Sequence, residues 1–314
     1  MDTVIEFKNV YKQFGSTAVL DDVSFRVQKH DVFGYIGSNG AGKTTSIRLT
    51  MGLLEPTQGE VMVLGEKPDQ ENIRSKIGFC FDNDGLYTNL TAYENMKFFD
   101  MVYHKGEGRE HRIKELLEMV NLEHVSDKTV NEFSRGMRKR LGLARALLAS
   151  PEILILDEPM IGLDPEGQAD IKQIIQNAKE TCTIFISSHN LNDVEELCNR
   201  VAILEHRILA EGLLENILAG TQSVVRVKLK ENCSIDQFAG LYKLGIGEIK
   251  LSHQEMHLVC QEQPDISAIT SFLLNNKIDF IEIGEVNNSL REKYFSLVRG
   301  KNDHENEMSE SNRI

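Results

Sequence analysis

The sequence predicts a protein of two domains, an α/β domain followed by a smaller α+β domain. Three observations indicate this division. A glycine-rich loop, GSNGAGKTT at Gly37 to Thr45, stands between an apolar strand and a helix. Two further apolar strands, EILILD and TIFIS, are joined by a segment with helical spacing, which is typical of a parallel-sheet crossover. From about Gln222 the pattern changes to the order βαββαβ.

The elements of the first domain follow from apolar periodicity. Strands are predicted at 4–10, 23–28 and 32–36, and a helix begins near Lys43 after the glycine-rich loop. After a strand at 77–81, Thr91 and Glu94 form a capping-box pattern at the start of a helix, and a mostly helical stretch extends to Ser150. Strands at 152–157 and 183–187 complete an α/β domain that contains a helical insertion.

The second domain alternates short strands and helices without any combination of residues that suggests chemistry. The strands are predicted at 223–229, 248–252, 256–260 and 278–286, and the helices at 234–244 and 265–276. This order resembles the ferredoxin-like arrangement. The final segment, KNDHENEMSESNRI, is polar and aperiodic. We therefore predict domains at 1–220 and 221–300, with a disordered tail at 301–314.

Composition limits the classes of function. The chain has 314 residues, of which 41% are hydrophobic and 26% charged, and its formal net charge is −13. This charge argues against general binding of nucleic acid, which requires clustered Lys and Arg. Apolar runs are strand-sized and no secretion signal precedes the first strand, so we expect a cytoplasmic protein. The five cysteines lack CxxC spacing, which favours reduced core thiols over a disulfide framework or a zinc site.

The glycine-rich loop matches the pattern GxxxxGK[ST] of a phosphate-binding loop. In such a loop the backbone amides hold the phosphates, Lys43 reaches the β- and γ-phosphate oxygens, and the Thr44 hydroxyl binds Mg²⁺. A plain glycine turn has no use for the Lys-Thr pair. We therefore predict ATP or GTP binding by the residues of this loop, Gly37, Ser38, Asn39, Gly40, Ala41, Gly42, Lys43, Thr44 and Thr45.

An acidic pair follows the apolar strand ILIL. Asp157 and Glu158 would lie at the carboxyl edge of the sheet, near the phosphates. Alone, such a pair is commonly a solvated turn, but the phosphate-binding loop upstream favours a catalytic interpretation. Asp157 would hold Mg²⁺ directly or through water, and Glu158 would orient the attacking water or accept its proton.

Between these motifs, FSRGM at 133–137 precedes a long amphipathic helix. Here the chain resembles the nucleotide-binding subunit of an ABC transporter, whose signature loop usually reads LSGGQ. Ser134 and Gly136 match that pattern, while Phe133, Arg135 and Met137 depart from it in a way similar to exporters of the ABC-2 type. A serine hydroxyl and a helix N-terminus remain to face a γ-phosphate. The resemblance covers about 4–220 and implies a RecA-like core with an antiparallel β subdomain and a helical subdomain.

The same resemblance assigns roles to four single residues. Phe14 stands where the family places an aromatic ring that stacks on adenine; ordinary core packing is the alternative for this residue. Asp164 matches an aspartate that makes contacts across the dimer, and His189 matches a histidine that contacts the γ-phosphate and water. Asp82 replaces the usual glutamine, and we expect it to keep a metal-side role as a hard oxygen donor.

These features predict an ATPase that powers a separate membrane permease, with ATP and Mg²⁺ as cofactors. A head-to-tail dimer follows from the resemblance, since each site needs the signature serine of a second copy or a paralogue. We expect a position at the cytoplasmic face of the membrane and export of an antibiotic, peptide or other toxic compound. The alternative is a soluble ABC ATPase acting on ribosomes, DNA or cofactor assembly. Such relatives usually carry two nucleotide domains or a long coiled coil, and neither occurs here.

Overall fold

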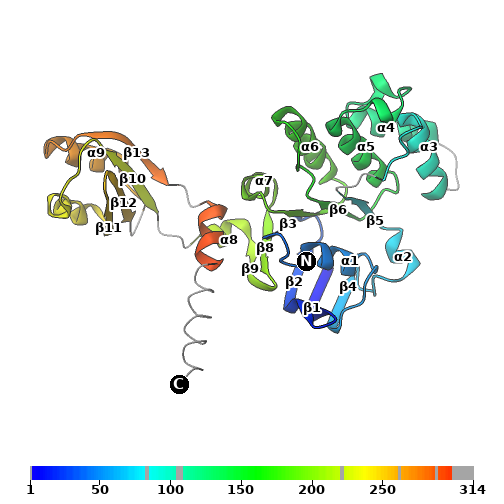
Figure 1. Ribbon diagram of the computed structural model, residues 1–314, viewed down its shortest axis with the longest axis horizontal. Helices are drawn as coiled ribbons and strands as arrows, with labels where there is room; N and C mark the ends of the chain where they lie inside the picture. The colour runs from blue at the N-terminus through cyan, green and yellow to red at the C-terminus, as the bar shows by residue number, and fades with distance from the viewer. Residues whose placement is uncertain are drawn as a thin grey trace. The chain divides into compact units, whose positions relative to one another are not determined.

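The computed structural model describes residues 2–81, 85–103, 109–219, 223–260, 263–286 and 289–298. The chain forms two compact units, Met1–Leu214 and Glu215–Ile314 (Figure 1). The predicted tail at 301–314 lies outside the described residues, as does Asp82. The first unit contains every other site residue that the sequence predicts.

The centre of the first unit is a mixed sheet in which six strands are described, in the order β5-β6-β7-β3-β8-β9. All neighbouring pairs are parallel except β8 and β9. Every residue of β3 and β7 is buried, as expected for parallel strands covered on both faces. The strands are β3 (Val32–Gly37), β5 (Ile77–Cys80), β6 (Ile153–Asp157), β7 (Thr183–Ser188), β8 (Arg200–Glu205) and β9 (Arg207–Leu213). The carboxyl ends of β3, β6 and β7 therefore meet at one edge.

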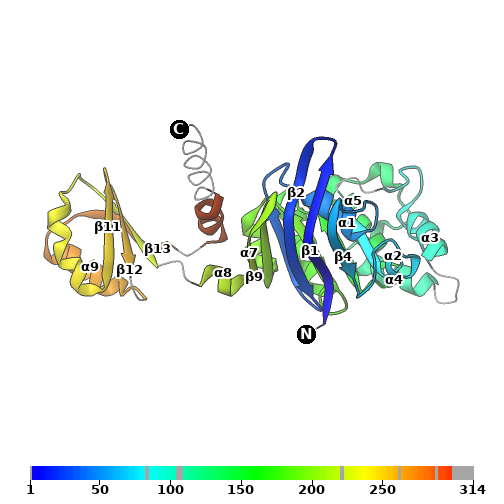
Figure 2. The same cartoon turned by 90° about the horizontal axis from the view of Figure 1, so that it is seen from below.

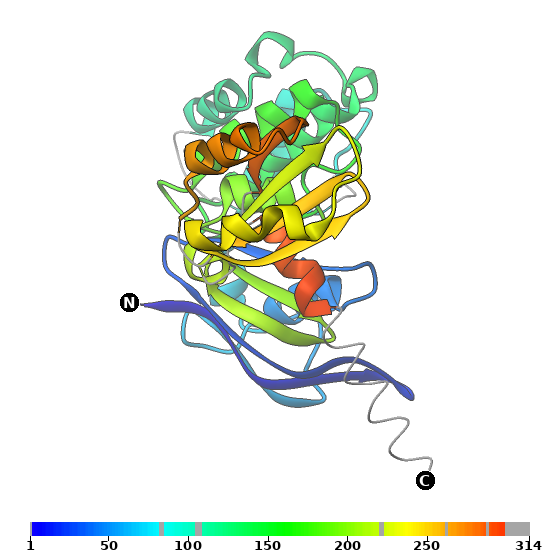
Figure 3. The same cartoon turned by 90° about the vertical axis from the view of Figure 1, so that its left-hand side faces the viewer.

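A second sheet of the first unit is antiparallel, with the described strands β1 (Thr3–Phe14), β2 (Thr17–Gln28) and β4 (Gln58–Val63) in the order β2-β1-β4. β1 and β2 run side by side as a long hairpin, dark blue in Figure 3. Apolar periodicity predicted shorter strands here and no strand at the positions of β4, β8 or β9. Aromatic rings that pack in stacked or tilted pairs form much of the core shared by the two sheets: Phe7, Phe25, Phe33, Tyr35 and Phe185.

The helices of the first unit connect these strands, and three of them form a separate helical region, cyan to green in Figure 1. That region contains α3 (Ala92–Tyr103), α4 (Arg109–Met119) and α5 (Arg135–Leu147), with short 3₁₀ turns η1 (Glu123–Val125) and η2 (Val130–Glu132). The other helices are α1 (Lys43–Thr50), α2 (Glu71–Arg74), α6 (Pro165–Ala178) and α7 (Leu191–Leu197). The helical insertion that the sequence predicts is therefore confirmed.

The start of α3 has the predicted capping box. The backbone N–H of Glu94 donates to Thr91 Oγ1 at 3.1 Å, and the N–H of Thr91 donates to Glu94 Oε2 at 2.8 Å. Further along α3, Asp100 is fully buried and accepts hydrogen bonds from Arg109 Nε at 2.7 Å and Arg112 Nη2 at 2.8 Å. This ion-pair cluster connects α3 to α4.

The second unit is an antiparallel sheet whose described strands have the order β11-β12-β10-β13. Its elements are β10 (Val224–Leu229), η3 (Ile235–Leu244), β11 (Ile246–Ser252), β12 (Glu255–Cys260), α9 (Ile266–Asn275) and β13 (Phe280–Val286). α8 (Leu214–Leu218) precedes them, and residues 290–298 are helical. Figure 2 shows α9 along one face of this sheet, where Phe238 and Leu273 join its buried core.

The βαββαβ order of the second unit agrees with the sequence prediction, with one difference. The segment 235–244 is a 3₁₀ helix and not the α-helix that its apolar spacing suggested. Gly240, a poor helix former, lies within it, and a Cβ there would come within 2.4 Å of the Phe272 ring of α9. Close packing of the two helical segments is therefore possible only with glycine at this position.

All five cysteines are free thiols; four of them are buried and Cys233 is partly buried. Burial raises the pKa of Cys182 to about 11, so this thiol stays protonated at neutral pH. In the parts of the chain that the structure describes, no helix is both long and apolar enough to span a bilayer.

Candidate functional site

The phosphate-binding loop joins the buried strand β3 to α1 and depends on its glycines. Gly40 has φ 90° and Gly42 has φ 111°, conformations that other residues rarely adopt. A Cβ at Gly42 would lie 2.5 Å from Leu20 Cδ2, and one at Gly37 would lie 2.5 Å from the carbonyl oxygen of Leu204. The glycines that define the motif are thus required by the backbone and by its neighbours.

Lys43 is the first residue of α1 and its side chain is buried. Its ammonium donates to the carbonyl oxygen of Gly37 at 2.7 Å and to that of Ser38 at 3.2 Å, so the side chain folds over the loop. No side chain in the described part of the chain caps the first turn of α1. The N–H groups of that turn and the ammonium therefore provide positive charge at one point, and a Cβ built on Gly40 would meet open space. This arrangement fits a polyphosphate.

Three residues predicted to be catalytic lie together at the carboxyl edge of the central sheet. Glu158 Oε2 is 2.8 Å from His189 Nδ1, and Glu158 Oε1 is 3.7 Å from Lys43 Nζ. Glu158 and His189 directly follow β6 and β7, and Lys43 begins α1 after the loop that follows β3. The parallel arrangement of these neighbouring strands accounts for the juxtaposition. Glu158 has φ 48°, an uncommon conformation for a residue other than glycine. Strained backbone of this kind is often found at active sites.

Asp157 ends β6 and accepts a hydrogen bond from Ser187 Oγ of β7. The carbonyl oxygen of Ser187 also accepts a hydrogen bond from the backbone N–H of Glu158, at 3.1 Å. Ser187 therefore fixes both acidic residues, a role that the sequence analysis did not foresee. Its position two residues before His189 was the available signal.

The residues predicted to bind metal are hard oxygen donors. Thr44 is exposed in the first turn of α1, and Asp157 is partly buried, while Asp82 lies outside the described residues. Mg²⁺ is commonly held by one or two protein oxygens together with phosphate oxygens. Thr44 and Asp157 fit such a site. Within the described residues, no group of three or more His, Cys, Asp or Glu side chains is placed to hold a metal.

Tyr35, in β3, contacts the helix α1 that follows the phosphate-binding loop. Its hydroxyl lies 3.0 Å from Ser46 Oγ of α1, and both side chains are fully buried. Burial raises the pKa of Tyr35 well above its usual value, so the phenol remains neutral. The sequence showed Tyr35 only as part of an apolar strand.

Phe14 lies at the end of β1, beside the turn to β2, and 47% of it is exposed. Lys12 Nζ lies 5.1 Å from the ring centroid. The interpretation of Phe14 as a core residue is therefore wrong. The exposed ring is available to a planar ligand.

The signature loop and Asp164 lie together, apart from the phosphate-binding loop. Ser134 caps α5 by accepting from the N–H of Met137 at 3.2 Å, and Asp164 caps α6 by accepting from the N–H of Gly167 at 3.0 Å. With Gly136 they line a hollow of about 450 Å³ between the starts of α5 and α6, and no residue of the phosphate-binding loop lines it. The two groups of predicted nucleotide-binding residues are therefore separate within one chain.

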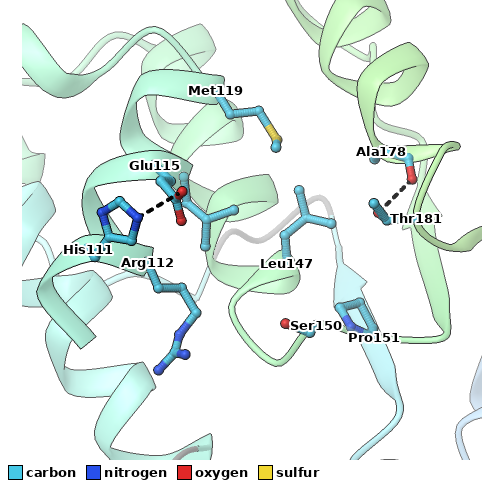
Figure 4. Close-up of a pocket in the computed structure, with 10 residues that line it drawn as sticks. His111, Arg112, Glu115, Met119, Leu147, Ser150, Pro151, Ala178 and Thr181 are labelled. Atoms are coloured by element: carbon cyan, nitrogen blue, oxygen red, sulfur yellow. Dashed lines mark hydrogen bonds and ion pairs between the residues drawn. The ribbon is translucent and has the colours of Figure 1, made fainter. Parts of the chain in front are cut away.

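A larger cavity, of about 640 Å³, lies among α4 and the ends of α5 and α6 (Figure 4). In it, His111 Nε2 is 3.2 Å from Glu115 Oε1, and Thr181 Oγ1 donates to the carbonyl oxygen of Ala178 at 3.0 Å. None of the predicted site residues lines this cavity.

Comparison with known proteins agrees with these features. The family model described as ABC transporter matches residues 20–161. The chain is 34% identical over 309 residues to the bacitracin transport ATP-binding protein BcrA of Bacillus licheniformis, covering 96% of this chain and 99% of that protein. It is also 38% identical over 210 residues to the lantibiotic transport ATP-binding protein SrtF of Streptococcus pyogenes, covering 66% of this chain and 90% of that protein.

Solved structures show the same fold for the first unit. An ATP-binding subunit of an ABC transporter superposes with a TM-score of 0.63 at 31% identity, covering 68% of this chain and 92% of that chain. A dimeric post-hydrolysis state of an ATP-binding cassette bound to ADP and Pi gives a TM-score of 0.60 at 28% identity, covering 67% of this chain and 98% of that chain. The chain is therefore an ATP-binding, ATP-hydrolysing member of the ABC transporter family.

Proposed function

We propose that this chain is the ATPase subunit of an ABC-2 type exporter that carries an antibiotic, peptide or other toxic compound through a separate membrane permease. The observation that carries the proposal is the similarity to the bacitracin transport ATP-binding protein, which extends over nearly the whole length of both chains and so includes the second unit. The second relative is a lantibiotic transport protein. Such relatives favour transport over the soluble, ribosome-associated alternative.

In this proposal the phosphate-binding loop holds the triphosphate of ATP. Lys43 and the N–H groups at the start of α1 neutralise the phosphate oxygens, and the exposed ring of Phe14 stacks on adenine. Mg²⁺, held by Thr44 and Asp157, would neutralise charge on the β- and γ-phosphates.

Glu158 and His189 prepare the attack on the γ-phosphate. The carboxylate of Glu158 orients the attacking water and accepts its proton, and the 2.8 Å contact with His189 Nδ1 fixes the direction of that carboxylate. His189 is then placed to contact the γ-phosphate and the water. The short distance from Glu158 to Lys43 supports a common site for all three groups.

Each ATP site is completed by a second copy of the chain or a paralogue. The hollow that contains Ser134, Gly136 and Asp164 is lined by no residue of the phosphate-binding loop, which supports a signature loop from another chain as the source of the remaining contacts. The dimeric cassette structure among the solved relatives supports this arrangement. ATP would then join two chains head to tail, and hydrolysis would release them.

The permease would dock on α3 at the cytoplasmic face of the membrane. Exposed apolar side chains gather here, since Phe98, Met101, Val102 and Tyr103 follow one another along α3 and Tyr87 packs edge-on against Phe98 at 4.8 Å between centroids. Buried Asn95 fixes Tyr87 by accepting from its N–H at 2.8 Å and donating to its carbonyl oxygen at 2.9 Å. A rigid, exposed aromatic surface of this kind suits a protein partner.

The second unit contains no cluster that suggests chemistry among its described residues, and we propose that it stabilises the assembled dimer. Deletion of residues 222–314 should then weaken assembly while leaving ATP binding intact. Unchanged ATPase activity and transport in the truncated protein would contradict this role.

The test of the exporter proposal is affinity purification of the Glu158→Gln variant with ATP from membranes of its source cell. This variant keeps the shape of the side chain but cannot accept a proton, so ATP-bound complexes should accumulate. Recovery of a permease with several membrane-spanning helices supports the proposal. Recovery of ribosomes or another soluble assembly, with no membrane protein, would replace it with the soluble-ATPase alternative.

A further inference from the structure

The turn between β8 and β9 contacts the phosphate-binding loop through side-chain and backbone hydrogen bonds. Glu205, the last residue of β8, accepts a hydrogen bond from the backbone N–H of Ser38 at 3.0 Å with Oε1 and one from Ser38 Oγ at 2.9 Å with Oε2. The two residues are 167 positions apart in the sequence. A carboxylate that accepts two hydrogen bonds from one residue fixes both the position and the direction of that residue.

Ser38 is one of the two residues whose carbonyl oxygens orient Lys43; the other is Gly37, at 2.7 Å. The carbonyl oxygen of Ser38 accepts from Lys43 Nζ at 3.2 Å and from the N–H of Ala41 at 3.2 Å. The N–H and hydroxyl of Ser38 thus face Glu205, and its carbonyl oxygen faces the ammonium of Lys43. A chain of contacts runs from Glu205 through Ser38 to the group that meets the phosphates.

The next residue of the turn secures the loop at a second point and connects it to β2. The N–H of His206 donates to the carbonyl oxygen of Ala41 at 3.2 Å, and its own carbonyl oxygen accepts from the N–H of Asp21 at 2.9 Å. Nδ1 of His206 lies 3.1 Å from the carbonyl oxygen of Val19. His206 makes these contacts with φ 60°, an uncommon conformation for a residue other than glycine.

From these contacts we infer that Glu205 is a positioning residue for ATP binding, which acts on the phosphates through Ser38 and Lys43. A carboxylate beside an anion-binding loop would by itself repel the phosphates, so its presence here is explained by the geometry that it imposes. The inference rests on the proposed role of the phosphate-binding loop as the nucleotide site.

The test measures MgATP binding to the purified full chain by calorimetry. Glu205→Ala should weaken binding about tenfold, since two charge-assisted hydrogen bonds to the loop are lost. Glu205→Gln should fall between that variant and the original chain, because the amide oxygen can still accept one bond. Glu211→Gln is the matched control: it removes a carboxylate from β9, where Glu211 pairs with Arg200 at 3.8 Å, and should leave binding unchanged.

A double-mutant cycle tests the route through Ser38. Ser38→Ala should weaken binding about threefold, and the double variant with Glu205→Ala should bind no more weakly than Glu205→Ala alone, because the hydroxyl acts only with its carboxylate partner. In steady-state hydrolysis KM should rise with the dissociation constant while kcat changes less than about twofold. A merely structural defect would lower kcat and the melting temperature without nucleotide instead.

Two results would overturn the inference. The first is a dissociation constant for MgATP of folded Glu205→Ala that lies within about twofold of the original chain's. The second is a double variant whose dissociation constant is raised by the product of the two single-variant factors, which would show that Glu205 and Ser38 act independently. If Glu205→Ala does not fold, Glu205→Gln and Ser38→Ala carry the same comparison. The Lys43→Ala variant distinguishes failure of this inference from failure of the proposed nucleotide site. Full ATP binding by Lys43→Ala would reject the proposed site. If Lys43→Ala loses ATP binding while Glu205→Ala binds ATP normally, only the role of Glu205 is rejected.

Discussion

Replacement of Phe14 by alanine should weaken ATP binding without affecting the binding of phosphate alone. With 47% of the residue exposed, an aromatic side chain of about 200 Å² leaves about 100 Å² accessible, of which a stacked base would cover about half. Burial of about 50 Å² on the ring and a similar area on the base contributes about 1.3–2.5 kcal/mol, or a weakening of about eight- to seventyfold. Stacking energies of about 1–3 kcal/mol per base agree with this range.

The assay compares the binding of MgATP and of inorganic triphosphate to Phe14→Ala by calorimetry. ATP binding should weaken by the stated factor, and triphosphate binding should remain unchanged because the phosphate-binding loop is intact. Tyr87→Ala is the matched control, since Tyr87 has nearly the same exposed fraction, 48%, on a different surface. Equal ATP affinity of Phe14→Ala and the original chain, or equal loss for ATP and triphosphate, would refute stacking by this ring.

The remaining predictions concern stability and docking. Asp100→Ala should lower the free energy of unfolding, measured in urea, by about 2–4 kcal/mol, because Arg109 and Arg112 lose a buried partner. The control Asp69→Ala, at an exposed position, should change it by less than about 0.5 kcal/mol. Equal effects of the two substitutions would show that the ion-pair cluster is dispensable. Burial raises the pKa of Cys182 to about 11, so between pH 9 and 11 its thiol ionises more in the unfolded chain than in the folded one. Stability should therefore fall by about 2 kcal/mol more in the original chain than in Cys182→Ala, and parallel pH curves would argue against this burial. Met101→Glu should preserve ATP binding and reduce recovery of the permease, and undiminished recovery would exclude α3 as the docking surface.

The parts of the site that the sequence predicts are those with local patterns. The glycines, Lys43 and Thr44 form one continuous loop, and Asp157 and Glu158 follow one strand, so the chemistry of each can be inferred from adjacent residues. Ser134 and Asp164 were assigned from the family resemblance, and the structure adds that each caps the helix that begins directly after it. The hollow that these two residues share between the starts of α5 and α6 could not be predicted from the sequence.

Contacts between distant segments escaped the sequence analysis. Ser187 bonds to Asp157 across 30 positions, and Glu205 bonds to Ser38 across 167. Neither serine nor glutamate at the end of a strand carries a pattern that names its partner. The hairpin of β8 and β9 was also missed, although it positions the loop. β8 has a run of four buried residues between β3 and β9, and so short an apolar run cannot be told from a buried helix segment by periodicity alone.

In the proposed cycle, ATP joins two copies of this chain through the phosphate-binding loop of one and the signature loop of the other. Light scattering of purified Glu158→Gln tests it most directly. With MgATP the mass should be twice the 35.5 kDa of one chain, with MgADP it should be that of one chain, and Ser134→Arg should abolish the ATP-dependent dimer while the exposed Ser75→Arg should not. A single-chain mass with MgATP, or an ATP-dependent dimer that persists in Ser134→Arg, would rule out this dimer.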